Sequence, residues 1–426
     1  MPDTMHSPQR VVITGMGAVT ALGHSEQSTW EAMREGRNGT SPIEGKGFDP
    51  YEWDVRIAGQ VRDWDPTSVI PRREARRLDR CAQLALFAAD EAVRSSGFDI
   101  SRENPERCGV IVGSGIGGIR TIEDGMGMLI TRGPGRISPF TVPRLMVNAA
   151  AGNISIRYGM CGPSSTHATA CASAGNAIGD AINHFRRGLV DVMVVGGAEA
   201  AISPLCVGAF MTMKALSTRN DDPAHASRPF DRDRDGFILA EGSAMFVIET
   251  EAHARARGAT IYATLLGSAN SSDAMHITAP DPKGRGASRS MRWALADAGV
   301  NLKDVDYVNA HGTSTPLGDR AEVTAVLSVF GDHARASAGG RLLMSSTKSI
   351  HGHCLGASGA VELIACVHAV RDGVVAPTIN LDNPEPEFDI DLVPHEARER
   401  PIRVAMNNTF GFGGHNVTLI IGRYSG

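Results

Sequence analysis

Short apolar runs alternate along the chain with longer segments in which apolar residues recur at helical spacing. A strand followed by a polar turn and a helix is the pattern of an α/β fold. The apolar runs predict strands, several of them entering a turn rich in glycine, at Arg10–Thr14, Gly109–Val112, Asp191–Val195, Tyr307–Ala310, Leu342–Ser346 and Val404–Met406.

Helical spacing is clearest in two segments. Arg76–Ser95 forms one predicted helix, and from Ala174 to Phe185 the apolar residues fall on a single helix face. The passage from helix to strand at Arg257–Gly258 is the best place to divide the chain. We therefore predict two halves, residues 1–258 and 259–426, each with its own strand, polar turn and helix.

Composition narrows the class of protein. The 426 residues carry a formal charge of −5 and are 42% hydrophobic, which is typical of a globular protein and argues against disorder or nucleic-acid binding. The N-terminus has no apolar signal-peptide region, and no apolar run reaches the ~18 residues of a membrane span. The scattered cysteines predict reduced thiols in a cytoplasmic protein: Cys81, Cys108, Cys161, Cys171, Cys206, Cys354 and Cys366.

Cys171 lies among small residues just before a predicted helix. The unpaired N–H groups and dipole of a helix N-terminus stabilise a thiolate, so we expect a lowered pKa for this thiol. The alternative is a buried structural cysteine, and on the placement alone the two are about equally favoured.

Two turns in the second half carry histidine. His311 ends a strand and precedes a loop of hydroxyl residues, and after that loop Asp319 and Glu322 have the spacing of a helix capping box. Lys348, His351 and His353 crowd a second turn, where a metal site is the rival interpretation although a third ligand is missing. Glu362 follows inside an apolar helix, so it needs a buried cation or hydrogen-bond donor.

Other segments carry weaker signals. Asn407–Asn416 is a glycine-rich, hairpin-like loop that could aim N–H groups at an oxyanion. Asp231–Gly236 imitates the start of a calcium-binding loop, but Gly242 stands where the bidentate glutamate is required. An arginine stripe on one predicted helix could dock an acidic partner, or could be an ordinary solvated face: Arg72, Arg73, Arg76, Arg77 and Arg80.

Taken together, the segments TACAS, NAHGTSTPLGD, KSIHGHCLGASG and GFGG resemble those of the elongating β-ketoacyl-[acyl-carrier-protein] synthases of type II systems. The resemblance covers nearly the whole chain. It implies a thiolase-like α/β fold of two similar halves in five layers (αβαβα), and a homodimer. It also implies condensation of a cysteine-bound acyl chain with malonyl-carrier protein in fatty-acid elongation, with loss of CO₂.

The resemblance assigns roles residue by residue. Cys171 would be the nucleophile, His311 and His353 would complete the triad, and Lys348 would support its electrostatics. Phe412 would supply an oxyanion-hole N–H and gate the site. For substrate binding, Asp273 would face the gate, Thr313 and Thr315 would bind the pantetheine arm, and Ile116 would line the acyl pocket.

The resemblance also implies a partner protein and a bound ion. An acyl carrier protein bearing 4′-phosphopantetheine would dock on Arg73, Arg76, Arg77 and Lys214. No cofactor is expected for catalysis, but a structural Na⁺ or K⁺ would bind near Asn309, Glu362, Asn407 and Asn408.

Two positions depart from the family pattern. Thr141 replaces a common phenylalanine at the pocket floor contributed by the partner subunit, and His351 has no assigned role, so the preferred chain length stays open. The alternatives are a polyketide-type ketosynthase, a non-catalytic chain-length subunit, and, more distantly, a zinc or thiol hydrolase.

Overall fold

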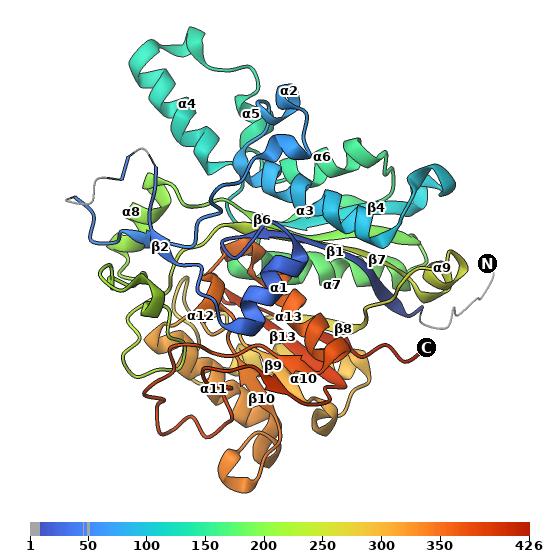
Figure 1. The fold of residues 1–426 in the computed structure, drawn as a ribbon, viewed down its shortest axis with the longest axis vertical. Coiled ribbons are helices and arrows are strands. Elements are labelled where there is room, and N and C mark those ends of the chain that lie inside the picture. The colour runs from blue at the N-terminus through green and yellow to red at the C-terminus, as the bar shows by residue number, and fades with distance from the viewer. Residues whose placement is uncertain (1–8, 46, 49–51) are drawn as a thin grey trace.

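The computed structural model describes residues 9–45, 47–48 and 52–426, so the N-terminal interpretation of residues 1–8 lies outside the described residues. A ten-stranded sheet runs through the molecule in the order β10-β9-β13-β14-β8-β1-β7-β6-β4-β5 (Figure 1). The first half contributes β1 (Val11–Thr20), β4 (Cys108–Gly113), β5 (Ser164–His167), β6 (Val192–Glu199) and β7 (Gly242–Thr250). The second half contributes β8 (Ala263–Ser272), β9 (Tyr307–Asn309), β10 (Leu343–Ser345), β13 (Val404–Gly411) and β14 (His415–Gly422).

The two halves repeat one topology. In each half, numbering its own strands along the chain, the order from the outer edge is third, second, fourth, fifth, first. The halves join where Val11–Ile13 of β1 pair antiparallel with Ala263–Leu265 of β8. This repeated order agrees with the two similar halves that the resemblance implied, while the exact boundary at residue 258 stays a prediction.

Helices complete five layers, as predicted. The central layer is α7 (Ser173–Arg186) and α13 (Ser358–Asp372), and each contacts strands of both halves. One outer layer contains α3 (Arg80–Ser96) and α6 (Ala149–Tyr158), and the other contains α10 (Arg285–Ala298) and α11 (Pro316–Phe330). Every residue of α13 from Ser358 to Val370 is buried, which is why this helix lacks a polar face (Figure 1).

The remaining elements are peripheral or short. The other helices are α1 (Glu26–Glu35), α2 (Arg72–Ala75), α4 (Ile119–Arg132), α5 (Thr141–Leu145), α8 (Pro204–Thr212), α9 (Glu251–Ala256) and α12 (Lys348–His351). Two small antiparallel pairs join β2 (Ser41–Pro42) to β3 (Ile57–Ala58) and β11 (Val374–Val375) to β12 (Arg398–Glu399). Within the part of the chain that the structure describes, no helix is both long and apolar enough to cross a membrane.

Two predicted boundaries were wrong. The first strand does not stop at Thr14 but continues through the glycines, because α3 lies against them: a Cβ on Gly15 would come within 2.2 Å of the Ala92 carbonyl oxygen. The predicted helix Arg76–Ser95 begins only at Arg80, where the Asp79 side chain accepts the Cys81 N–H and caps α3. The arginines upstream therefore do not form one helical stripe.

Candidate active site

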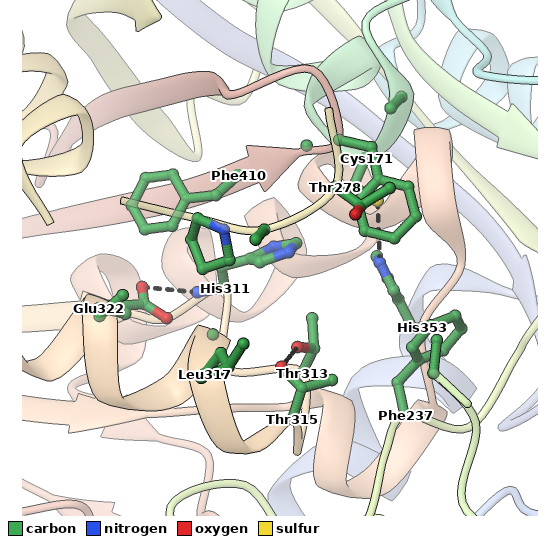
Figure 2. Close-up of a pocket in the computed structure, with 18 of the residues that line it drawn as sticks. Cys171, Phe237, Thr278, His311, Thr313, Thr315, Leu317, Glu322, His353 and Phe410 are labelled. Atoms are coloured by element: carbon green, nitrogen blue, oxygen red, sulfur yellow. Dashed lines mark hydrogen bonds between the residues drawn. The ribbon is translucent and has the colours of Figure 1, made fainter. Parts of the chain in front are cut away.

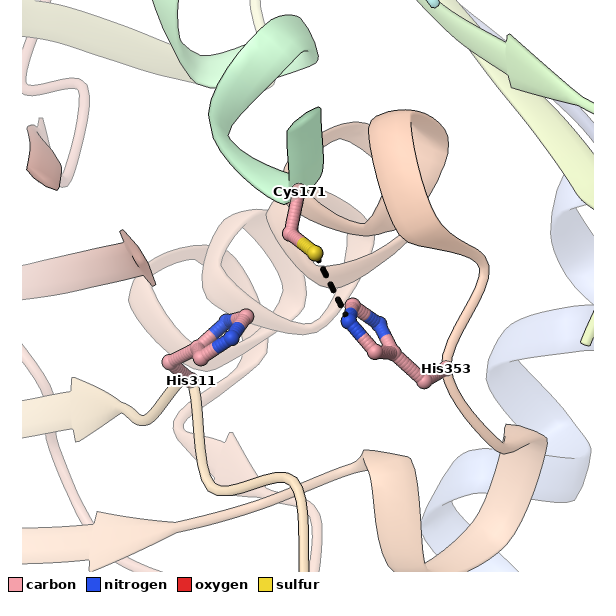
Figure 3. A group of neighbouring side chains, drawn as sticks. All are labelled: Cys171, His311 and His353. Carbon is pink, nitrogen blue, oxygen red and sulfur yellow. Dashed lines mark hydrogen bonds between the residues drawn. The ribbon is translucent and has the colours of Figure 1, made fainter. Parts of the chain in front are cut away.

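Cys171 stands at a bend between β5 and α7, on a short 3₁₀ turn over Ala170–Ala172 (Figure 3). Ala170 adopts a φ of 51°, in the left-handed region that non-glycine residues rarely occupy. The bend exposes the sulfur to the cavity although Cys171 as a whole is only 8% accessible. The predicted position at the start of a helix is confirmed.

His353 faces the sulfur directly. Its Nε2 lies 3.0 Å from Cys171 Sγ and its Nδ1 lies 2.9 Å from Ser358 Oγ, so the ring is held at both nitrogens. The Phe237 ring packs edge-on against it at 5.2 Å between centroids. A hydroxyl both donates and accepts, so Ser358 can support either tautomer of this imidazole. Ser358 is a site residue that sequence reasoning missed, although it lies within the LGASG segment.

His311 lies at right angles to His353, with ring centroids 5.3 Å apart, and comes from the loop after β9 (Figures 2 and 3). Its backbone N–H donates to Glu322 at 2.8 Å, and that of Gly312 donates to the same carboxylate at 2.7 Å. His311 Nδ1 is buried and has no hydrogen-bond partner among the described residues. The ring is therefore held by its backbone and keeps a nitrogen free for a substrate.

The capping-box interpretation of Asp319 and Glu322 was wrong. Helix α11 begins at Pro316, and both carboxylates lie buried inside it. Asp319 accepts the backbone N–H groups of Phe230 and Ser314, while Glu322 holds the His311 loop. The spacing suits a cap equally well, and only the position of the neighbouring loops distinguishes the two roles.

Burial controls the protonation of the three groups. It raises the pKa of the Cys171 thiol to about 12, although Lys348 and the N–H groups of Phe412 and Cys171 act to lower it. The expected lowering of this pKa was therefore wrong. Burial and, secondly, Lys348 hold the pKa values of His311 and His353 well below the usual range. A neutral thiol thus faces two neutral imidazoles, and the sulfur must lose its proton as it reacts.

Lys348 and Glu362 form a fully buried ion pair behind the triad. The expectation that Glu362 needs a buried cation is confirmed. His351 does not join His353 in a metal pair, because its Nε2 bonds Thr347 Oγ1 at 3.1 Å on the same helix turn. The group that could bind a soft metal is instead Cys171, His311 and His353, whose ligand atoms lie within 4.8 Å of one another.

The turn between β13 and β14 lies next to the sulfur of Cys171. The backbone N–H groups of Phe412 and Cys171 are close enough to the sulfur to act to lower its pKa, and the assignment of these groups to an oxyanion hole stays a prediction. Gly411 permits this approach, since a Cβ there would lie 2.7 Å from the Thr169 carbonyl oxygen. Asp273 lies in the facing loop and donates its N–H to the Gly414 carbonyl at 2.9 Å.

The triad opens into a cavity of about 600 Å³ (Figure 2). Its lining includes residues that the sequence placed in substrate binding or docking: Ile116, Lys214, Asp273, Thr313, Thr315 and Phe412. The hydroxyls of Thr313 and Thr315 lie 3.0 Å apart on one side of it. Thr141 is not part of this lining and lies on α5, so a role at the pocket floor requires a second copy of the chain.

Three buried oxygens near the predicted cation position have no hydrogen-bond partner among the described residues: Asn309 Oδ1, Glu362 Oε2 and Asn407 Oδ1. Asn309 and Asn407 are register partners on the adjacent strands β9 and β13. The fourth predicted ligand, Asn408, differs because its Oδ1 accepts a hydrogen bond from Thr418. Unsatisfied buried oxygens of this kind suit a hard cation.

The arginine cluster divides into two environments. Arg72, Arg73, Arg76 and Arg77 are exposed, as a docking surface requires. Arg80 instead turns inward and pairs with the buried Glu241 at 2.7 Å. The docking expectation therefore keeps Arg73, Arg76 and Arg77, with Lys214 exposed at the cavity mouth.

Comparisons with known proteins agree with this geometry. The chain matches the family "Beta-ketoacyl synthase, N-terminal domain" over residues 8–254 and "Beta-ketoacyl synthase, C-terminal domain" over 262–382. It is 46% identical over 416 residues to a 3-oxoacyl-[acyl-carrier-protein] synthase 2 of Synechocystis sp., covering 98% of each chain. A protein of the same description from Coxiella burnetii is 46% identical over 415 residues, covering 97% of this chain and 99% of that one.

Solved structures give the same fold. A beta-ketoacyl synthase from Burkholderia phymatum superposes with a TM-score of 0.89 at 36% identity, covering 98% of this chain and 100% of that one. A structure of a type II PKS acyl-carrier protein in complex with its ketosynthase matches with a TM-score of 0.89 at 31% identity and the same coverage.

A reactive cysteine between two neutral histidines, on a duplicated five-layer α/β fold, defines an enzyme of the thiolase-like class. Within that class, this chain belongs to the beta-ketoacyl synthase family.

Proposed function

We propose that this protein is a 3-oxoacyl-[acyl-carrier-protein] synthase that extends a cysteine-bound acyl chain by decarboxylative Claisen condensation. The observation that carries the proposal is the meeting of Cys171, His311 and His353 in one largely apolar cavity. A soft nucleophile that also leaves well suits a thioester, and neutral imidazoles suit an enolate that develops negative charge.

In the first step, Cys171 Sγ attacks the carbonyl carbon of an acyl-carrier thioester. The thiol proton passes to His353 Nε2, 3.0 Å away, because the buried thiol does not ionise by itself. The N–H groups of Cys171 and Phe412 stabilise the tetrahedral oxygen. The carrier thiolate then leaves and takes the proton from His353, and the acyl chain remains on the sulfur.

In the second step, malonyl-carrier protein binds in the same cavity and loses CO₂. Before this step His353 changes from the tautomer that carries its proton on Nδ1 to the one that carries it on Nε2, and Ser358 supports both forms. His311 and His353 Nε2–H then donate hydrogen bonds to the resulting enolate oxygen. The enolate carbon attacks the acyl-cysteine carbonyl, the Cys171 thiolate leaves and takes up one proton from solvent, and a 3-oxoacyl-carrier protein is released.

The relatives favour fatty-acid elongation over the polyketide alternative. Proteins named 3-oxoacyl-[acyl-carrier-protein] synthase 2 share 46% identity with this chain, whereas the type II PKS ketosynthase shares 31%. A complete triad argues against a non-catalytic chain-length subunit, and the family match argues against a hydrolase.

The test is intact mass spectrometry after incubation with acyl-carrier proteins of increasing chain length. A mass increase equal to the acyl group, localised to Cys171 by peptide mapping, is expected. The most reactive chain length then identifies the preferred substrate. Acylation at another residue, or loss of the acyl group as free acid without transfer to malonyl-carrier protein, would contradict the proposal.

We further propose that the carrier protein docks on Arg73, Arg76, Arg77 and Lys214 and passes its phosphopantetheine arm along Thr313 and Thr315. The exposed guanidinium groups and the lysine at the cavity mouth support docking of an acidic partner. The paired hydroxyls inside the mouth can bond the amides of the arm.

A homodimer is also proposed. β5 lies at one end of the sheet and pairs only with β4, which leaves its other edge open. Large apolar side chains are exposed on α4, α5 and α6 and in the connections on either side of α5: Met126, Leu129, Ile130, Ile137, Phe140, Val142, Met146 and Ile156. Light scattering should give twice the chain mass, and a monomer at micromolar concentration would refute the dimer.

A structural Na⁺ or K⁺ is proposed on Asn309, Glu362 and Asn407, supported by their unpartnered oxygens. The melting temperature should then rise in KCl or NaCl relative to choline chloride at equal ionic strength, and equal values would refute the site. The seven unpaired cysteines support a cytoplasmic location, which a fractionation experiment can test.

A further inference from the structure

The second half of the molecule repeats the bend that carries the nucleophile. A 3₁₀ turn over Leu355–Ala357 precedes α13, just as Ala170–Ala172 precedes α7. The first residue of each turn has a left-handed φ, 45° at Leu355 and 51° at Ala170. Gly356 therefore stands at the position equivalent to Cys171, so the molecule contains a second bend with no nucleophile.

A buried carboxylate occupies this second bend. Glu199, at the end of β6, accepts the Gly356 N–H at 3.1 Å and the Gly115 N–H at 2.7 Å on the same oxygen. In the first bend, the equivalent backbone N–H of Cys171 points at the nucleophilic sulfur. In the second half, the backbone N–H of Gly356, which is equivalent to that of Cys171, therefore binds the carboxylate of Glu199.

The other carboxylate oxygen of Glu199 binds the loop that leads to the cavity. It accepts the Ser114 hydroxyl at 3.0 Å and the backbone N–H groups of Ile116 and Gly117 at 3.2 Å and 3.3 Å. Glu199 is completely buried. Every partner is a donor, so the site requires a side chain that only accepts, which is an ionised carboxylate.

The two segments held by Glu199 are adjacent parts of one cavity wall, since a Cβ on Gly356 would lie 2.3 Å from the Gly115 nitrogen. Gly115 and Ile116 from one segment and Leu355 from the other line the cavity together with Cys171. No room remains between the carboxylate and these segments, since a Cβ on Gly356 would lie 2.7 Å from Glu199 Oε2. Glu199, which does not itself line the cavity, therefore fixes the distance between Ile116 and Leu355.

We propose that Glu199 is a positioning residue that fixes two adjacent segments of the acyl-pocket wall and so determines which acyl chains Cys171 accepts. This inference rests on the proposed function. Glu199 touches neither the substrate nor the sulfur, and it acts through Ile116 and Leu355.

The test replaces Glu199 with Gln and compares acylation of Cys171 by hexanoyl- and palmitoyl-carrier proteins. The amide places N–H groups against backbone N–H groups, so at least one wall segment must move. The fit of one methylene in an apolar pocket is worth about tenfold or more. We therefore expect the ratio of the two kcat/KM values to change by about tenfold in Glu199→Gln.

The matched control is Glu249→Gln. Glu249 is equally buried, lies on β7 and contacts Thr14, His253 and Arg257, none of which lines the cavity. This variant should lose thermal stability and keep the native ratio of the kcat/KM values for hexanoyl- and palmitoyl-carrier proteins. A native ratio in Glu199→Gln, or an equal change in both variants, would overturn the inference. Failure of the native protein to acylate Cys171 would instead refute the proposed function.

A second measurement needs no acyl substrate. The charge of Glu199 acts to raise the pKa of the Cys171 thiol, so iodoacetamide alkylation of Glu199→Gln should reach its maximum at lower pH than in the native protein.

Should that variant fail to fold, Ser114→Ala removes one of the five donors and should change the same acylation ratio in the same direction. An unchanged ratio in a folded Ser114→Ala protein would then overturn the inference.

Discussion

Two opposing influences act on Cys171. The helix N-terminus and Lys348 favour the thiolate, but burial disfavours it and prevails. A resting neutral thiol resists oxidation and premature alkylation, and His353 removes the proton only when an acyl carbonyl is in place. The reactivity of this residue therefore depends on its neighbour and not on a low pKa of its own.

Replacement of Cys171 by Ala removes the acyl acceptor. We expect no detectable 3-oxoacyl product, while release of CO₂ from malonyl-carrier protein continues because His311 and His353 remain. Product can be followed by mass spectrometry and CO₂ by radiolabel. Cys161→Ser is the control, since Cys161 is exposed and does not line the cavity. Unaltered condensation in Cys171→Ala would refute the nucleophile.

At the scale of elements, strand β13 brings its end against the start of α7. Gly411 makes this contact possible, because the Thr169 carbonyl oxygen and the Cys171 nitrogen lie 2.7 Å and 3.1 Å from where a Cβ would stand. The Phe412 N–H reaches the sulfur only when these two elements meet. The oxyanion hole is thus a property of a strand and a helix in contact.

Gly411→Ala should separate that strand end from the helix. A displacement of about 1 Å at a reacting centre can cost about 100-fold in rate, so we expect a loss of that order in kcat. Overpacking should also lower stability by about 1–3 kcal/mol. Steady-state kinetics and thermal melting measure both effects. Gly152→Ala on α6 meets nothing within 4 Å and should keep full activity. Native kcat in Gly411→Ala would contradict the proposed contact.

Across the whole molecule, partly buried ion pairs join secondary-structure elements, some of which are distant in sequence. His253 on α9 bonds Glu249 of β7 and Glu103 of the first half's outer surface. The hydrogen bond to Glu249, against the effect of burial, and the one to Glu103 raise the pKa of His253 to about 9. Burial raises the pKa of Glu249, but bonds from Arg257, His253 and Thr14 prevail and lower it to about 2.

These pKa values predict how stability varies with pH. The contribution of protonated His253 is complete below its ordinary pKa of 6.5 and is lost as pH rises through about 9. We expect a loss of roughly 1–3 kcal/mol in unfolding free energy across that range. Urea titrations at several pH values measure it. In His253→Gln this part of the decline should disappear, and an unchanged decline would show that other groups cause it.

The proposed docking of the carrier protein depends on charge at the surface. Reversing Arg76 and Arg77 to Glu should raise the KM for an acyl-carrier protein by about tenfold and weaken its dependence on salt. Acylation by a small acyl thioester should stay unchanged, since the cavity is untouched. Arg289→Glu, an exposed arginine on α10, is the control. Equal effects of the two charge reversals would contradict a specific docking surface.

The fold class and part of the site could be predicted from short segments of the sequence. Alternating apolar runs and helical segments predicted the α/β class, the apolar spacing after Cys171 predicted its helix, and the resemblance of the segments around His311 and His353 to a known family indicated one site. These features can be predicted because each depends on residues that are close in the chain, and because helices and strands have fixed periods.

Tertiary structure decided the rest, because burial and long-range contact have no local signature. Gly15 appeared to end a strand but makes room for α3, and Glu322 had the spacing of a cap but holds the His311 loop. The thiol pKa rose where the helix position predicted a fall, since desolvation depends on everything packed around the sulfur. Residues separated by most of the chain create that environment, and only folding brings them together.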